Sequence, residues 1–94
     1  MKHRFAFAGF RHIHIDDLYN FAKESQDIEI AGAAEDNPTS AEAARERGID
    51  ITDSSIEELM KRADQFDVIA VGDYYGRRGS LAIAALEAGK HVIL

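Results

Sequence analysis

Three short segments of this 94-residue sequence carry residue types that bind phosphate groups and sugar hydroxyls. Each follows an apolar run, and they are Gly9-Phe10-Arg11-His12-Ile13, Glu35-Asp36 and Gly72-Asp73-Tyr74-Tyr75. A glycine turn that opens a helix can bind phosphate through backbone N–H groups, and an acid about 20 residues further on can bind ribose hydroxyls. Together, the three segments predict a binding site for a dinucleotide.

The first segment retains only part of the glycine pattern G-x-G-x-x-G. Gly9 occupies its first position, whereas Arg11 and His14 stand where the second and third glycines belong. The Arg11 side chain could fill the phosphate site, could bond the pyrophosphate directly, or could be a solvated surface arginine. These interpretations stay open, and we expect the residues from Gly9 to Ile13 to take the pyrophosphate together with the helix N-terminus.

The second segment places Glu35 about 20 residues beyond the glycine turn, which is the spacing of the ribose-binding acid. A carboxylate there accepts hydrogen bonds from ribose hydroxyls and repels a 2′-phosphate, and Asp36 adds negative charge. The segment therefore favours NAD over NADP as the cofactor. The alternative interpretation of Glu35 is a solvated acid in the turn before a helix.

The third segment, Gly72 to Tyr75, lines the opposite side of the expected crevice. Its tyrosines could stack on a cofactor or face a partner domain, and ordinary loop packing is the alternative. His12 and His14 have no evident third ligand nearby, so we predict no metal site. No Ser/His/Asp or paired-carboxylate arrangement can be defended from the sequence, so no catalytic residue is predicted.

The elements that must position these segments alternate between strand and helix. Strands are expected at 4–8, 28–34, 49–51, 68–71 and 91–94, with helices at 12–24, 38–47, 56–63 and 80–88. Asn37 is expected to cap the second helix, with Pro38 at its first position, and Ser55 to cap the third. The last helix is expected to pack through Leu81, Ala82, Ala85 and Leu86.

Strands separated by helices of about ten residues build a parallel sheet with helices on both faces. The predicted fold is therefore a doubly wound, Rossmann-like α/β sheet of five strands in the order 3-2-1-4-5, with four helices. Ligands bind such sheets at the carboxyl ends of the strands, where all three segments lie.

Composition excludes several other kinds of partner. The net charge is −6 and the basic residues form no cluster, which argues against nucleic acid and anionic membrane. The absence of cysteine excludes disulfides and thiolate chemistry, and no apolar run approaches the ~20 residues of a membrane span. We expect a single soluble, cytoplasmic domain over residues 1–94.

The sequence resembles the N-terminal domain of the glucose–fructose oxidoreductase, inositol dehydrogenase and MocA family. Residues Leu81 to Val92 are similar to the family's fourth helix and fifth strand almost letter for letter. The stretches Ile28 to Pro38 and Asp67 to Val71 are similar to its second and fourth strands. The resemblance implies a Rossmann domain that binds NAD or NADP within an oxidoreductase.

Some positions depart from the family's pattern. Arg11 and His14 replace glycines, the loop Asp73-Tyr74-Tyr75 replaces a Thr-Pro-Asn type of sequence, and Arg78 stands near a family histidine. The family's fifth strand runs into a Glu-Lys-Pro motif and later a substrate domain. By this resemblance, the family's Glu-Lys-Pro motif and substrate domain would follow the position of Leu94, the last residue of this sequence.

The leading hypothesis is the cofactor-binding part of an NAD-dependent oxidoreductase acting on a sugar, polyol or related hydroxy compound, inactive by itself. The alternative is a non-catalytic nucleotide- or partner-binding module, which the incomplete glycine motif favours. A third hypothesis is a structural fragment without a ligand. In every case the expected apolar edge at His91–Leu94 predicts a homo-oligomer.

Overall fold

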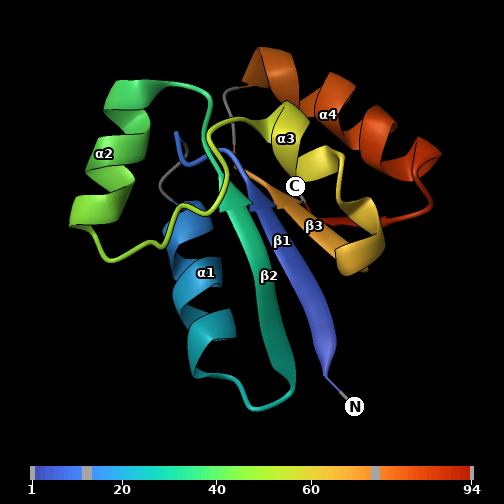
Figure 1. Cartoon of the computed structure of the whole chain (residues 1–94), viewed down its shortest axis with the longest axis horizontal. Coiled ribbons are helices and arrows are strands. Elements are labelled where there is room, and N and C mark those ends of the chain that lie inside the picture. The colour runs from blue at the N-terminus through green and yellow to red at the C-terminus, as the bar shows by residue number, and fades with distance from the viewer. Residues whose placement is uncertain (1, 12–13, 73–74, 94) are drawn as a thin grey trace.

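A computed structural model describes residues 2–11, 14–72 and 75–93, with the backbone alone for 75–78. Its centre is a four-stranded parallel sheet in the order β2-β1-β3-β4 (Figure 1). The strands are β1 (His3–Ala8), β2 (Ile28–Ala34), β3 (Val68–Val71) and β4 (His91–Ile93). The helices are α1 (His14–Glu24), α2 (Pro38–Glu46), α3 (Ile56–Met60) and α4 (Tyr75–Glu87), with a 3₁₀ turn η1 (Ala63–Gln65) after α3. The predicted α/β class is confirmed.

The core lies on both faces of the sheet because successive side chains of a strand point to opposite faces. Along β1, Phe7 belongs to one apolar cluster, while Ala6 and Ala8 belong to the other. Helices α1 and α2 contribute to the first cluster, and α3 and α4 contribute to the second. A central strand buried from both sides explains why the β1 sequence reads as a continuous apolar run.

Several predicted helix signals are confirmed. The Asn37 side chain accepts a hydrogen bond from Ser40 N at 2.9 Å, and the Ser55 hydroxyl accepts one from Glu58 N at 3.1 Å. Helix α2 is followed by Gly48 with a φ of 91°, a conformation that side chains other than glycine rarely adopt.

The expected strand at residues 49–51 is wrong. This segment buries Ile49 and Ile51 in the first cluster, but its pairing with β2 is reduced to a single bridge between Ala34 and Asp53. Side chains occupy backbone groups of β2 at this edge: Arg62 Nη1 donates to Ala31 O at 3.0 Å, and the Thr52 hydroxyl accepts from Ala33 N at 2.9 Å.

The same arginine holds the segment that follows 49–51. Arg62 forms an ion pair with Asp53 and thereby lowers the pKa of that carboxyl below its ordinary value. Gly32 makes room for the guanidinium, because a Cβ at residue 32 would lie 2.3 Å from Arg62 Nη2. A side chain thus replaces a strand at this edge of the sheet.

Helix α4 also differs from the expectation. It begins at Tyr75 rather than Ser80, although Gly76 and Gly79 each cost a helix about 1 kcal/mol relative to alanine. Leu86 was expected to pack against the sheet but is 62% exposed, whereas Ala85 is buried. The small residue therefore makes the close contact with the sheet.

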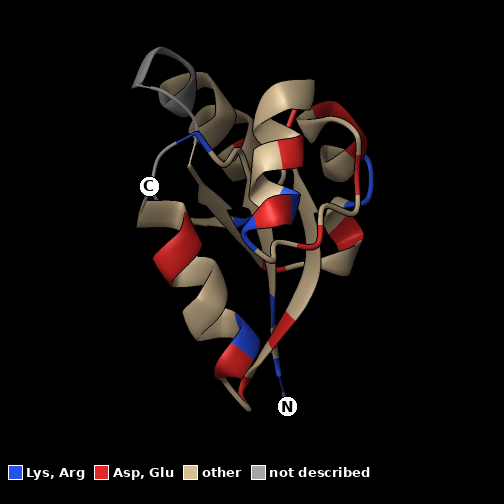
Figure 2. Cartoon of the chain, turned by 90° about the vertical axis from the view of Figure 1, so that its left-hand side faces the viewer, with Lys and Arg blue, Asp and Glu red and all other residues tan. Residues whose placement is uncertain are grey.

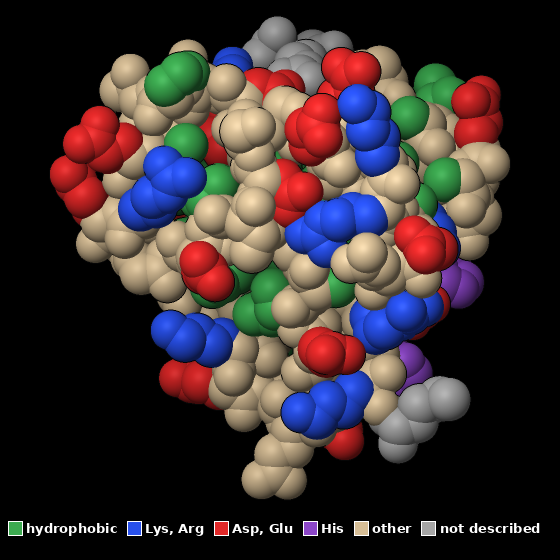
Figure 3. Space-filling model, in the orientation of Figure 1, with side chains coloured by type: hydrophobic (Ala, Val, Ile, Leu, Met, Phe, Trp, Pro, Cys, Tyr) green, Lys and Arg blue, Asp and Glu red, His purple; other side chains and the backbone are tan. Residues whose placement is uncertain are grey.

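Charges of both signs are spread over the molecular surface. Acidic and basic residues both occur on the side formed by α1 and α2, which faces the viewer in Figure 2. They are also interspersed on the face shown in Figure 3. Among the described helices, none is long and apolar enough to cross a membrane.

Candidate functional site

Backbone hydrogen bonds join the turn after β1 to the two neighbouring strands. Gly9 N donates to Ala34 O at 2.9 Å, at the end of β2, and Arg11 N donates to Gly72 O at 3.1 Å, just beyond β3. Gly72 N in turn donates to Ala8 O at 2.9 Å. The carboxyl ends of three adjacent strands therefore meet, and the described parts of the three predicted segments lie together as the strand order requires.

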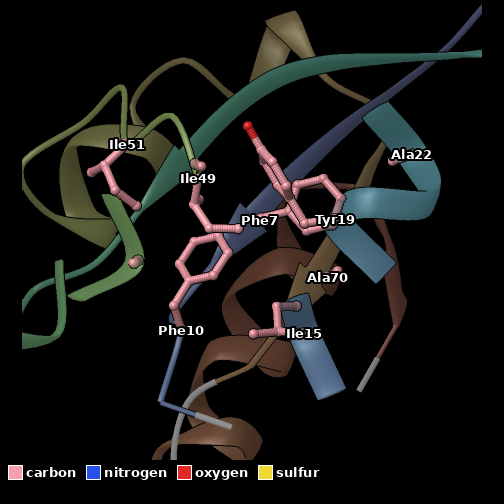
Figure 4. Packing of buried hydrophobic residues seen from close by; sticks show 10 residues of the cluster. Phe7, Phe10, Ile15, Tyr19, Ala22, Ile49, Ile51 and Ala70 are labelled. Atoms are coloured by element: carbon pink, nitrogen blue, oxygen red, sulfur yellow. The ribbon is translucent and has the colours of Figure 1, made fainter. Parts of the chain in front are cut away.

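The turn itself depends on Gly9. Its φ is 88°, in the left-handed region that side chains other than glycine rarely adopt. The next residue, Phe10, is 4% exposed and packs its ring against Tyr19, with centroids 6.1 Å apart (Figure 4). Phe10 was predicted as a binding residue, but its ring lies in the core and its backbone N–H donates to Glu35.

Glu35 lies buried between the first and second turns. Its Oε1 accepts a hydrogen bond from Phe10 N at 2.8 Å, and its Oε2 accepts one from Asn37 N at 2.8 Å. The residue is 1% exposed, so the interpretation as a solvated turn acid is wrong. A carboxylate that accepts two backbone N–H groups fixes the two turns relative to each other.

Asp36 points to a different element. Its Oδ1 accepts a hydrogen bond from Ile56 N at 2.6 Å, at the first residue of α3. This contact ties the turn after β2 to the helix on the opposite face of the sheet. Asp36 and Glu35 are adjacent in sequence, but each acid is bonded to a different backbone group.

Arg11 lies directly beside the buried acid. Its Nε is 3.5 Å from Glu35 Oε2, and its side chain is 29% exposed. Phe10 and Arg11 also line an open hollow of about 430 Å³ together with Asp16, Asp17 and Arg47. The interpretation of Arg11 as only a solvated surface residue does not account for its pairing with a buried carboxylate.

Arg47 and Asp16 connect α2 to the first turn of α1 across this hollow. They form an ion pair, through which Asp16 raises the pKa of Arg47. Neither residue is predicted as part of the site from the sequence. They are separated by 31 positions, and neither helix carries a local pattern that indicates the pairing. Only the packing of α2 beside α1 brings them together.

Gly72 allows the end of β3 to approach the first turn closely. A Cβ at this position would lie 2.7 Å from Gly9 O and 2.5 Å from Ile15 Cβ. These distances are shorter than real Cβ contacts, so the predicted site residue Gly72 has a steric requirement of its own. A glycine at position 72 therefore lets β3 end close to the turn after β1 and to α1.

Of the remaining predicted residues, His12, Ile13, Asp73 and Tyr74 lie outside the described residues, and Tyr75 begins α4. His14, at the place of the third glycine, is the first residue of α1 and is exposed. In the described part of the chain, no group of three or more His, Cys, Asp or Glu residues could hold a metal ion.

Several solved structures have a similar fold over nearly the whole of this chain. A protein classed as an oxidoreductase from Erwinia carotovora atroseptica SCRI1043 matches 97% of this chain with a TM-score of 0.79 and 30% identity. An NAD-binding protein from Listeria innocua matches 98% with a TM-score of 0.77 and 26% identity. The WlbA dehydrogenase from Chromobacterium violaceum, solved with NADH and UDP-GlcNAcA, matches 97% with a TM-score of 0.75 and 25% identity.

The matches cover only part of those proteins. This chain spans 27%, 26% and 26% of their respective lengths. No protein-family model and no curated protein sequence matches the chain.

Proposed function

We propose that this chain is the nicotinamide-dinucleotide-binding domain of an oxidoreductase, because the solved structures similar to it are NAD-binding oxidoreductases of the glucose–fructose oxidoreductase, inositol dehydrogenase and MocA type, matched over their N-terminal portions. The observation that carries the proposal is the meeting of three turns at the carboxyl ends of β1, β2 and β3. Doubly wound sheets bind their ligands at this place, where the strand order reverses.

The residues present fit a dinucleotide in kind. The turn at Gly9 leads to the N-terminus of α1, where backbone N–H groups and the helix dipole favour a pyrophosphate. Glu35 accepts two backbone N–H groups, and a carboxylate has about four acceptor positions, so two positions remain for ribose hydroxyls. We assign Glu35 to the adenosine ribose and the segment from Gly72 to Tyr75 to the nicotinamide side.

We propose NAD as the preferred cofactor and NADP as the weaker one, because the turn after β2 carries the carboxylates of Glu35 and Asp36, which would repel the 2′-phosphate of NADP. The bound nicotinamide would supply hydride transfer. The substrate would be a sugar, polyol or related hydroxy compound, which the complex of the WlbA dehydrogenase with UDP-GlcNAcA supports. This chain would hold and orient the cofactor, and we expect no turnover by the 94-residue chain alone.

Calorimetric titration of the chain with NAD and with NADP tests the proposal. We expect saturable binding of NAD with a Kd below about 1 mM, the upper end of the usual range for enzyme ligands, and weaker binding of NADP. The absence of binding by both dinucleotides at this concentration would overturn the proposal. Tighter binding of NADP would overturn the assigned preference alone.

A second candidate function is a binding module without catalysis. The observation that favours it is the ion pair between Arg11 and Glu35, which places a side chain over the ribose-binding acid. In that case, NAD would fail to bind in the titration even though the chain is folded. A purely structural role would give the same result, and a search for partner proteins would then separate the two.

We also propose that the 94-residue chain self-associates through β4. Within the described residues β4 pairs with β3 alone, and Ile93 on β4 is 39% exposed. An unpaired strand edge can pair with another chain. Sedimentation velocity at increasing concentration should show dimers or larger species, and the Ile93→Lys variant should show fewer of them. A monomer at every concentration would contradict this proposal.

A further inference from the structure

Three acids beside the proposed site, Glu35, Asp36 and Asp16, have specific hydrogen-bond or ion-pair partners. Glu35 has two backbone N–H donors and the Arg11 guanidinium around it. Asp36 accepts from the backbone of Ile56 at 2.6 Å. In the hollow beside Arg11, Asp16 is paired with Arg47, and Asp17 is a further acid that lines it. The repulsion that Glu35 would exert on an incoming phosphate therefore depends on Arg11.

The position of Arg11 is fixed from its backbone. Arg11 N donates to Gly72 O, which anchors the residue between the ends of β1 and β3. From there the side chain reaches across to Glu35, at the end of β2. The guanidinium consequently lies beside the acid that would read the adenosine ribose, although the sequence places Arg11 in the pyrophosphate turn.

A guanidinium in this place changes what the ribose site can accept. It carries five N–H donors in a planar fork and can bridge a carboxylate and a phosphate. The Glu35 carboxylate alone would repel a 2′-phosphate, whereas the Glu35–Arg11 pair has no net charge. The Arg11 side chain is 29% exposed and that of Glu35 is 0% exposed, so an approaching ligand meets Arg11 first.

We propose that Arg11 determines the cofactor specificity of this site. Its guanidinium contacts the 2′-phosphate and so lets the site take NADP as a second, weaker ligand beside NAD. The inference rests on the proposed dinucleotide function and deepens it. The ribose-reading device is then a pair of side chains from two different turns, rather than a single acid.

The test compares Kd values for NAD and NADP in the wild-type chain and in Arg11→Ala and Arg11→Lys. A charge-assisted hydrogen bond contributes enough that its loss should raise the ratio of the NADP Kd to the NAD Kd by about tenfold or more in Arg11→Ala. Arg11→Lys keeps the charge and should keep the ratio close to that of the wild type. Arg45→Ala is the matched control, because it removes an exposed arginine of α2, and it should leave both Kd values unchanged.

The other outcomes separate this inference from the proposed function. If Arg11→Ala, shown to be folded by its circular dichroism, binds both dinucleotides more weakly by the same factor, Arg11 acts on the shared pyrophosphate and the inference is wrong. If it binds both more tightly by the same factor, Arg11 obstructs the site and the inference is equally wrong. If the wild-type chain binds neither dinucleotide, the proposed function fails and this inference with it.

Discussion

Replacement of Gly72 by alanine is expected to lower the free energy of unfolding by about 3 kcal/mol. The added Cβ would lie 2.7 Å from Gly9 O and 2.5 Å from Ile15 Cβ. The first of these is a backbone atom that a change of rotamer cannot move away. Relief therefore requires a shift of the turn after β1, or of α1, away from the end of β3. Urea denaturation monitored by circular dichroism measures the change.

Gly79 offers a matched control for this substitution. A Cβ at residue 79 would meet no atom within 4 Å, and the residue lies inside α4. Gly79→Ala should therefore raise the free energy of unfolding by about 0.5–1 kcal/mol through helix propensity alone. Equal effects of the two substitutions would show that the close approach at Gly72 is not a steric requirement.

The second large effect is expected for Glu35→Ala, which should lower the free energy of unfolding by about 2–4 kcal/mol. The substitution leaves the N–H groups of Phe10 and Asn37 without the acceptors they have at 2.8 Å. It also removes the partner of Arg11 and the proposed ligand of the ribose. Dinucleotide binding should be lost even at temperatures where the variant remains folded.

Two further variants separate these contributions. Glu35→Gln keeps one oxygen acceptor but turns an NH₂ group toward the other backbone N–H, so its stability should lie between those of Glu35→Ala and the wild type. Glu42→Ala removes an exposed acid of α2 and should change the free energy of unfolding by less than about 0.5 kcal/mol. If Glu35→Ala is as stable as Glu42→Ala, Glu35 does not act as a clamp between the turns.

Much of the fold could be predicted from periodicity and caps. The order of four strands, the parallel pairing and the capping roles of Asn37 and Ser55 are confirmed. These features depend on local sequence, since apolar runs bounded by helix signals leave few alternatives for a doubly wound sheet. The solved structures that match the chain confirm the resemblance to the oxidoreductase family, which is most specific at residues 81–92.

The errors have a common physical cause, which is contact between residues far apart in the sequence. At the edge of β2 where a strand at 49–51 was expected, Arg62 donates to a backbone carbonyl 31 positions earlier. The alternative interpretation of Glu35, a solvated acid in a turn, is wrong because Phe10 N, 25 positions earlier, holds its carboxylate inside the protein. No local pattern contains either contact, because both depend on which strands become neighbours.

The bond from Arg11 N to Gly72 O joins residues separated by most of the chain, and the candidate site is assembled from such contacts. The site therefore belongs to the cooperative unit of folding, rather than to a loop that orders independently. A domain of this size has only about 5–10 kcal/mol of stability, so a substitution anywhere in the core changes the population of binding-competent molecules. By the same linkage, a ligand that binds the native state raises the melting temperature of the whole domain.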